Sequence, residues 1–349
     1  MTAANAVAFI LVVGVTTYAV FGGADFGAGL WSLLAGGGES GRRPRELIDW
    51  AIGPVWEANH VWLIFVFVVL WTGFPSAFEA IFSTLFIPLS LAAFGIVLRG
   101  AGFAFQNTAR RARGRALATT VFGASSLLTP FFMGTVVGAI VGGRVPVGNA
   151  AGDPVTSWVN TLSLVTGALF VATGAYLASV FLVSDARRAG TRDLEEYFTR
   201  RALAAALFTG ALAAANLFVL HADAPSVFDG LKSDGLALVI LSVACGAAVL
   251  VLLRRGARRG ARVLAAGAVA AVVWGWAVAQ HPDVLPPSLT ISSAAAPSAT
   301  LKTLLVIFGV AILVVVPSIG LLFTLVQRNL VEEASQPARE RGETSQATP

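Results

Sequence analysis

The stretch of sequence that decides the fold is residues 53–64, GPVWEANHVWLI, which opens an otherwise apolar segment. Three polar side chains, those of Glu57, Asn59 and His60, fall within it. An ionisable group in the hydrocarbon of a bilayer costs at least a few kcal/mol, so such groups usually face a protein interior or a water-filled path and carry function. The stretch therefore predicts a membrane helix that bears a functional site.

The composition of the whole chain agrees with a membrane protein. Hydrophobic residues make up 56% of the chain, charged residues only 12%, and the mean hydropathy is +0.78, whereas soluble proteins carry about 25% charged residues. The formal net charge of +5 comes from arginines in short loops between apolar segments, so nucleic-acid binding is not expected. The single cysteine, Cys245, excludes a disulfide within the chain and a two-cysteine metal site.

Apolar segments of about 20 residues predict an all-α polytopic protein with about nine transmembrane helices. Two four-helix units plus one peripheral helix are the expected arrangement. Residues 1–330 are expected to form a single membrane domain, and the polar residues 331–349 a disordered tail. The predicted spans are 4–34, 51–72, 76–99, 117–142, 157–184, 199–221, 235–253, 261–280 and 302–327.

Basic residues predict the orientation of these spans. Nearly all of the 24 Lys and Arg residues lie in alternate loops and in the C-terminal tail, and only Arg144, Lys232 and Lys302 fall on the opposite side. Because Lys and Arg accumulate in cytoplasmic loops, the N-terminus is predicted outside and the C-terminus in the cytoplasm.

The first span carries an acid within a glycine-rich segment. Gly22, Asp25 and Gly29 share one helical face, while Gly23 and Gly27 lie on roughly the opposite face. The second pair has the small-xxx-small spacing that lets helix backbones approach closely. Asp25 is thereby left on a stripe that a partner helix, substrate or water could reach. The alternative is an acid near the cytoplasmic end of the span.

In that alternative, Asp25 extends toward the membrane surface or pairs with Arg42 or Arg45. Both interpretations remain open from the sequence alone.

The second span places its acid deeper. Glu57 lies roughly 10 Å past Trp50 along a helix, inside the inner leaflet. His60 shares the face of Glu57 at i+3, and Asn59 follows Trp56 in the same way, so a polar patch is expected.

Opposite influences act on Glu57. Burial favours its neutral form, whereas a nearby helix start or the cation Arg99 favours its ionised form, and such a balance suits an acid that carries protons. The alternative is a satisfied internal network of Glu57, His60 and Arg99 that only fixes the packing of helices.

The chain contains few residues that can serve as axial ligands of haem iron. Haem iron needs axial His, Met or Cys, and the chain has 3 His, 2 Met and 1 Cys. His60 is the only histidine expected well inside the membrane. The chain alone is therefore expected to be a poor host for several haems.

These motifs resemble subunit II of the cytochrome bd-type quinol oxidases. The resemblance rests on residues 18–29 (YAVFGGADFGAG), 53–64, 99–103 (RGAGF), 285–291 (LPPSLTI) and 294–297 (AAAP). Together with the predicted spans, it covers essentially the whole chain, and the N-terminal half carries most of its specificity.

The resemblance implies a heterodimer in the bacterial inner (plasma) membrane, in which a homologous subunit I holds haems b and d. That subunit would oxidise quinol and reduce dioxygen to water, while this multi-pass chain stabilises it and supplies protons from the cytoplasm. This chain would hold no metal. The abundance of Ala, Gly and Arg over Lys is typical of a high-GC bacterium, for which menaquinol is the expected donor. A bound quinone and small single-helix accessory subunits stay open.

The resemblance also assigns roles to residues of this chain. Glu57 would lie on the proton path, where many members have Asp, with His60 and Asp25 as helpers. Trp56, Asn59 and Arg99 would support the path, Arg99 as a counter-ion. The competing hypotheses are an ion-coupled secondary transporter and a purely structural scaffold subunit.

Overall fold

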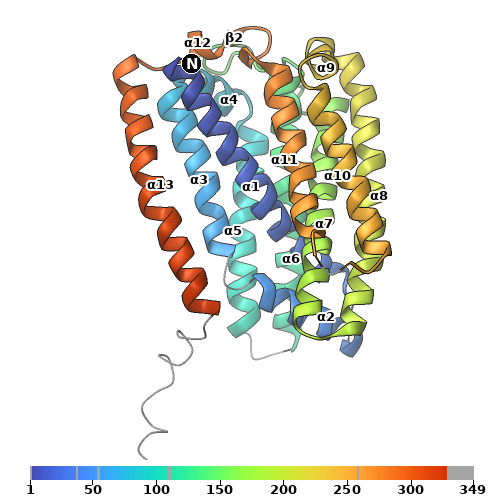
Figure 1. The fold of residues 1–349 in the computed structure, drawn as a ribbon. Helices are drawn as coiled ribbons and strands as arrows, with labels where there is room; N and C mark the ends of the chain where they lie inside the picture. Colours follow the sequence, from blue (N-terminus) through green and yellow to red (C-terminus); the bar gives the residue numbers. More distant parts are fainter. Residues whose placement is uncertain (1, 37, 53–55, 109–111, 258, 328–349) are drawn as a thin grey trace, which may run out of the picture. The chain divides into compact units, whose positions relative to one another are not determined.

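The computed structural model describes residues 2–36, 38–52, 56–108, 112–257 and 259–327. It consists of helices and one short hairpin (Figure 1). The chain divides into two compact units, Met1–Ala296 and Pro297–Pro349. The first unit holds the helices α1 (Ala3–Leu34), α2 (Gly38–Ile52), α3 (Trp56–Gly73), α4 (Pro75–Thr84), α5 (Phe86–Thr108), α6 (Ala112–Val141), α7 (Thr161–Arg188), α8 (Arg192–Asp223), α9 (Pro225–Lys232), α10 (Leu236–Arg254), α11 (Ala261–Gln280) and α12 (Ile291–Ala294). The second holds α13 (Ser298–Gln327).

Helix α1 organises the first unit. It packs against α3, α6 and α7 and, over a smaller area, against α11. The neighbours pair among themselves as α5 with α6, α7 with α8, and α10 with α11. Strands β1 (Asp283–Leu285) and β2 (Leu289–Thr290) form an antiparallel hairpin. Figure 1 shows the N-terminus at the end of this unit that bears β2 and α12, and α2 at the opposite end.

The contact between α1 and α7 depends on glycine. A Cβ atom added to Gly27 would lie 1.9 Å from the carbonyl oxygen of Gly174, and one added to Gly174 would lie 2.8 Å from that of Gly23. No side chain fits at such distances, so the two backbones touch directly. The predicted close approach at the Gly23 and Gly27 face is confirmed.

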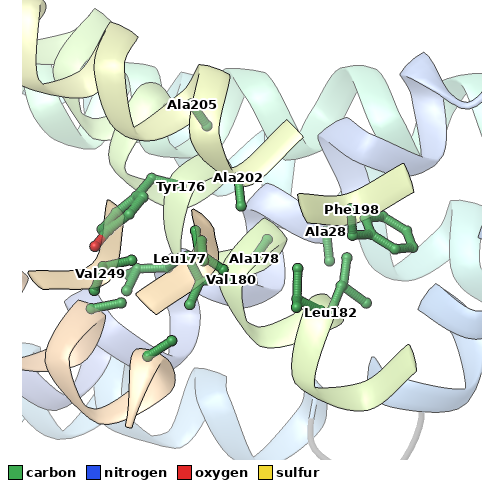
Figure 2. Close-up of a cluster of buried hydrophobic side chains, with 14 of the residues drawn as sticks. Ala28, Tyr176, Leu177, Ala178, Val180, Leu182, Phe198, Ala202, Ala205 and Val249 are labelled. Atoms are coloured by element: carbon green, nitrogen blue, oxygen red, sulfur yellow. The ribbon is translucent and has the colours of Figure 1, made fainter. Parts of the chain in front are cut away.

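A buried apolar cluster surrounds this crossing. Figure 2 shows side chains from α1, α7, α8 and α10 that meet there, among them Ala28, Leu177, Phe198 and Val249. Small alanines let the helices approach, and the larger Leu and Phe side chains fill the space between them. The crossing of α1 with α7 therefore forms the centre of the unit.

The structure confirms an all-helical membrane architecture. Among the described residues, 7 helices are long and apolar enough to cross a membrane: α1, α5, α6, α7, α8, α10 and α11. The bent pair Asn59–Gly73 and Pro75–Thr84 adds an eighth if it is one span, and Ser298–Val314 is a shorter apolar helix. The total of about nine spans, their grouping and the orientation in the membrane stay predictions.

The helices differ from the predicted spans in three places. The segment expected as one span over 76–99 is divided at Leu85 between α4 and α5. A separate bend of 119° lies between α3 and α4, where Phe74 precedes Pro75. Pro75 occupies the first position of α4, where its missing N–H is tolerated. The span expected from 157 begins only at Thr161, where Asn160 caps α7. The span expected over 199–221 extends from Arg192 to Asp223.

A surface helix was also missed. Residues 38–52 form α2, whose polar and apolar residues alternate with a helical period, so hydropathy alone does not reveal it. Leu47 and Ile48 are buried on one side of it, whereas Glu46 is exposed. Residues 53–55 and the tail predicted over 331–349 lie outside the described residues.

Candidate functional site

Asp25 of α1 and Arg99 of α5 form a buried ion pair. Arg99 Nη1 donates to Asp25 Oδ2 at 2.9 Å, and Nη2 donates to Oδ1 at 2.8 Å. Their side chains are 2% and 1% exposed, respectively. Two parallel hydrogen bonds between a guanidinium and a carboxylate form a strong, geometrically specific contact. The pair joins two helices that are 74 residues apart in sequence.

Arg99 makes two further hydrogen bonds. Its Nε donates to Ser126 Oγ of α6 at 3.0 Å, and Nη2 donates in addition to the backbone carbonyl of Asp25 at 3.2 Å. Ser126 in turn donates to the carbonyl of Phe122 at 2.7 Å. A buried ion pair is tolerated when such extra hydrogen bonds offset the loss of hydration. The network ties α1, α5 and α6 together.

Aromatic rings enclose the guanidinium. Arg99 Cζ lies 5.0 Å from the ring centroid of Phe26 and 4.8 Å from that of Phe122. At these distances a ring face attracts a cation. The ring of Tyr18 lies edge-on to Phe26, with the centroids 6.5 Å apart. The rings shield the pair from solvent, so its charges interact at a low local dielectric.

Glycines make room for this network. A Cβ atom added to Gly29 would lie 2.1 Å from Ser126 Oγ, and one added to Gly102 would lie 2.8 Å from the backbone nitrogen of Phe122. Gly29 belongs to the face of α1 that carries Asp25. The glycine-rich sequence thus brings α1 and α5 close enough to α6 for Arg99 to reach both partners.

The structure decides between the two interpretations of Asp25. Asp25 pairs with Arg99, whereas Arg42 pairs with Glu46 and Arg45 donates to the carbonyl of Gly36. The alternative pairing of Asp25 with Arg42 or Arg45 was therefore wrong. Arg99, which the sequence offered as a cation near Glu57, pairs with Asp25.

The residues of the decisive motif begin α3. Trp56 and Glu57 lie in its first turn, and their side chains are outside what the structure describes. Asn59 is buried, and the ring of His60 lies 6.0 Å from that of Phe26, at an interplanar angle of 72°. His60 thus contacts the ring that covers Arg99, so the motif lies beside the Asp25–Arg99 pair.

Two acids that were not singled out in the sequence also matter. Asp185 of α7 accepts from Arg262 of α11 at 2.9 Å and pairs with Arg188 at 3.0 Å. Arg262 is the second residue of the apolar helix α11. A cation at that position was the feature of the sequence that could have indicated the ion pair with Asp185. Gln106 Nε2 of α5 lies 3.4 Å from Asp49 Oδ2 of α2.

Within the described part of the chain, no group of three or more His, Cys, Asp or Glu residues could hold a metal ion.

Comparison with known proteins gives a consistent result. The sequence profile of "Cytochrome bd terminal oxidase subunit II" matches residues 3–326. A Bacillus subtilis protein described as a putative cytochrome bd menaquinol oxidase subunit II is 23% identical over 89% of this chain and 92% of its own length. The Escherichia coli cytochrome bd-I ubiquinol oxidase subunit 2 is 27% identical over 38% of this chain and 34% of its own length.

A solved structure agrees with the sequence matches. A chain of the bd oxidase from Geobacillus thermodenitrificans superimposes with a TM-score of 0.75, at 26% identity, over 94% of this chain and 100% of that chain.

Proposed function

Because the chain belongs to the cytochrome bd terminal oxidase subunit II family, we propose that it carries protons from the cytoplasm to a partner subunit that reduces dioxygen. The chain is a multi-pass protein of the bacterial plasma membrane and one subunit of a quinol oxidase. We propose that haems b and d lie in the partner, subunit I. Reduction of dioxygen to water consumes protons, and quinol supplies the electrons. Protons drawn from the cytoplasm would then add to the membrane potential.

The contacts of Asp25 favour a division of roles between the two predicted acids. Protonation of Asp25 would leave the buried guanidinium of Arg99 without its counter-charge, which is strongly unfavourable. We therefore assign Asp25 and Arg99 a structural and electrostatic role rather than a place in the proton relay. Glu57 is then the acid of the decisive motif that carries protons, with His60 beside it.

The exposed side chains of α3 support a position of Glu57 next to the partner. Val61, Ile64, Val68 and Trp71 are all exposed and recur every three or four residues, so they form one helical stripe. Counting four residues back from Val61 reaches position 57. We propose that this stripe contacts subunit I and that protons cross to the partner at Glu57.

The first unit also contains an apolar cavity of about 590 Å³ between α1, α6, α7 and α8. Its lining includes Leu30, Trp31, Phe131, Val171 and Phe208. We propose that this cavity holds the isoprenoid chain of a bound quinone. Menaquinone is the proposed species, since the Bacillus subtilis relative is described as a menaquinol oxidase.

Filling the cavity is expected to remove this quinone. Ala204 lines the cavity and is exposed, so Ala204→Trp should occupy it from the membrane side. We expect roughly a tenfold loss of quinone extracted per haem from the purified complex, since a ligand that meets a filled cavity loses its apolar burial. Leu207→Trp is the control, because Leu207 is exposed on the same helix and is not among the lining residues. Equal quinone content in both variants would contradict the assignment.

The test of the proposed proton path is substitution of Glu57. Glu57→Ala in the assembled complex is expected to slow quinol-driven oxygen consumption about tenfold or more, because a positioned acid–base group typically contributes at least that factor. The haem spectrum should stay unchanged. Glu57→Asp should retain most of the rate, since it keeps a carboxyl group.

Glu79→Gln provides the matched control, because Glu79 is an exposed acid of α4. Normal turnover of Glu57→Ala would remove Glu57 from the mechanism. Loss of haem together with turnover would instead favour the purely structural role.

A further inference from the structure

Helix α2 places the acid Asp49 at the end of the first unit that is predicted to face the cytoplasm. The helix is amphipathic and is not among those long and apolar enough to cross a membrane. Its buried residues Leu47 and Ile48 hold it against the bundle, and Asp49, the next residue, is half-buried. The carboxyl group of Asp49 therefore lies at the boundary between solvent and the bundle.

The contact of Asp49 inside the bundle is weak. Gln106 Nε2 lies 3.4 Å from Asp49 Oδ2, which is long for a hydrogen bond. Gln106 Oε1 is buried and accepts no hydrogen bond from the part of the chain that the structure describes. A buried oxygen of this kind is a natural partner for a water molecule. The carboxylate of Asp49 is therefore held less firmly than that of Asp25, which accepts two hydrogen bonds from Arg99.

The position of Gln106 connects α2 with the buried site. Gln106 and Arg99 are seven residues apart on α5, so they share a helical face about 10 Å apart along the axis. Asp49 itself lies in the last turn of α2, which ends at Ile52, and Glu57 lies in the first turn of α3, which begins at Trp56. Asp49 is therefore the acid that precedes Glu57 along the chain and borders the same helix as the buried pair.

The charges near Asp49 leave it able to exchange protons near neutral pH. Burial raises the pKa of Asp49 to about 6, Arg45 opposes this increase, and Glu46 adds to it. The neighbouring Arg42 is paired with Glu46, and Arg43 with Asp193 of α8. Gln106, the contact from α5, carries no charge.

We propose that Asp49 collects protons from cytoplasmic water and delivers them to Glu57. In each cycle the Asp49 carboxylate takes a proton from water and releases it inward, so its own charge is restored. This role rests on the proposed function of Glu57. It adds a second acid, at the surface, to the path.

The test compares the pH dependence of oxygen consumption in the assembled complex. Asp49→Asn keeps the shape of the side chain and removes its titration. We expect turnover per haem to be within about twofold of the unchanged complex near pH 6, where protons are abundant. Near pH 8.5 it should fall roughly fivefold, because proton collection then limits the rate. Asp49→Glu should restore the profile.

Glu196→Gln is the matched control, since Glu196 is an exposed acid of α8 and is not among the groups that shift the pKa of Asp49. Its profile should follow that of the unchanged complex. A slow Glu57→Ala complex together with an unaltered Asp49→Asn profile would overturn this inference alone. Normal turnover of Glu57→Ala would overturn the proposed function as well. An Asp49→Asn defect that is equal at every pH, or a complex that fails to assemble, would show a structural role and overturn the inference.

Discussion

Arg99→Met is expected to destabilise the subunit by about 3–5 kcal/mol, because it leaves a buried carboxylate without its counter-charge. The Asp25 side chain is only 2% exposed, so bulk water does not solvate its carboxylate. The substitution also removes the hydrogen bond to Ser126 and the contacts with the rings of Phe26 and Phe122. Thermal unfolding of the purified complex, followed by the haem spectrum, measures the loss.

Arg42→Met is the control for this prediction. Arg42 pairs with Glu46 one helical turn away, and both side chains are 58% exposed. Exposed pairs of this kind contribute less than about 1 kcal/mol. If both substitutions lowered stability equally, the buried pair would have no special role in holding α1, α5 and α6 together.

A double substitution separates stability from proton transfer. Asp25→Leu combined with Arg99→Met removes both charges, and replacement of a whole buried pair by apolar groups is often neutral for stability. We expect the double variant to recover most of the stability lost in Arg99→Met. If it also retains turnover, Asp25 is not a proton carrier. A double variant that is stable but inactive would place Asp25 in the relay, contrary to the role proposed above.

Local sequence features predicted much of the site. The spacing of Gly22, Asp25 and Gly29 placed the acid on one face of α1 and the close-packing pair on the other. Gly29 indeed contacts Ser126, and Gly27 contacts Gly174. Periodicity is fixed by the geometry of a single helix, so it can be derived without knowing the neighbouring helices.

The partners across helices could not be derived in this way. The sequence offered Arg99 as a counter-ion for Glu57, and Arg42 or Arg45 as the partner of Asp25. The choice depends on which helix packs beside α1, a long-range property that helical spacing does not contain. The break at Leu85 between α4 and α5 was missed for a different reason. Mean hydropathy over a window measures apolar content and does not show where a helix ends within an apolar segment.

The crossing of α1 and α7 leads to the last prediction. Gly27→Ala is expected to destabilise the subunit by about 3 kcal/mol or more, because overpacking of a tight contact forces backbone shifts. The added Cβ atom would meet the carbonyl oxygen of Gly174 at 1.9 Å and its carbon at 2.2 Å. Both are backbone atoms, so no side-chain rotation can relieve the overlap. Thermal unfolding of the complex again provides the measurement.

Gly23→Ala is the matched control, one helical turn away on the same face. Its Cβ atom would lie 3.5 Å from a methyl carbon of Leu177, an ordinary contact, and alanine is favoured over glycine within a helix by about 1 kcal/mol. Gly23→Ala should therefore leave stability unchanged or raise it slightly. Equal losses in the two variants would mean that any added volume on this face is harmful. A loss confined to Gly27 would identify the backbone contact with Gly174 as the point that fixes α1, and with it Asp25, relative to the rest of the unit.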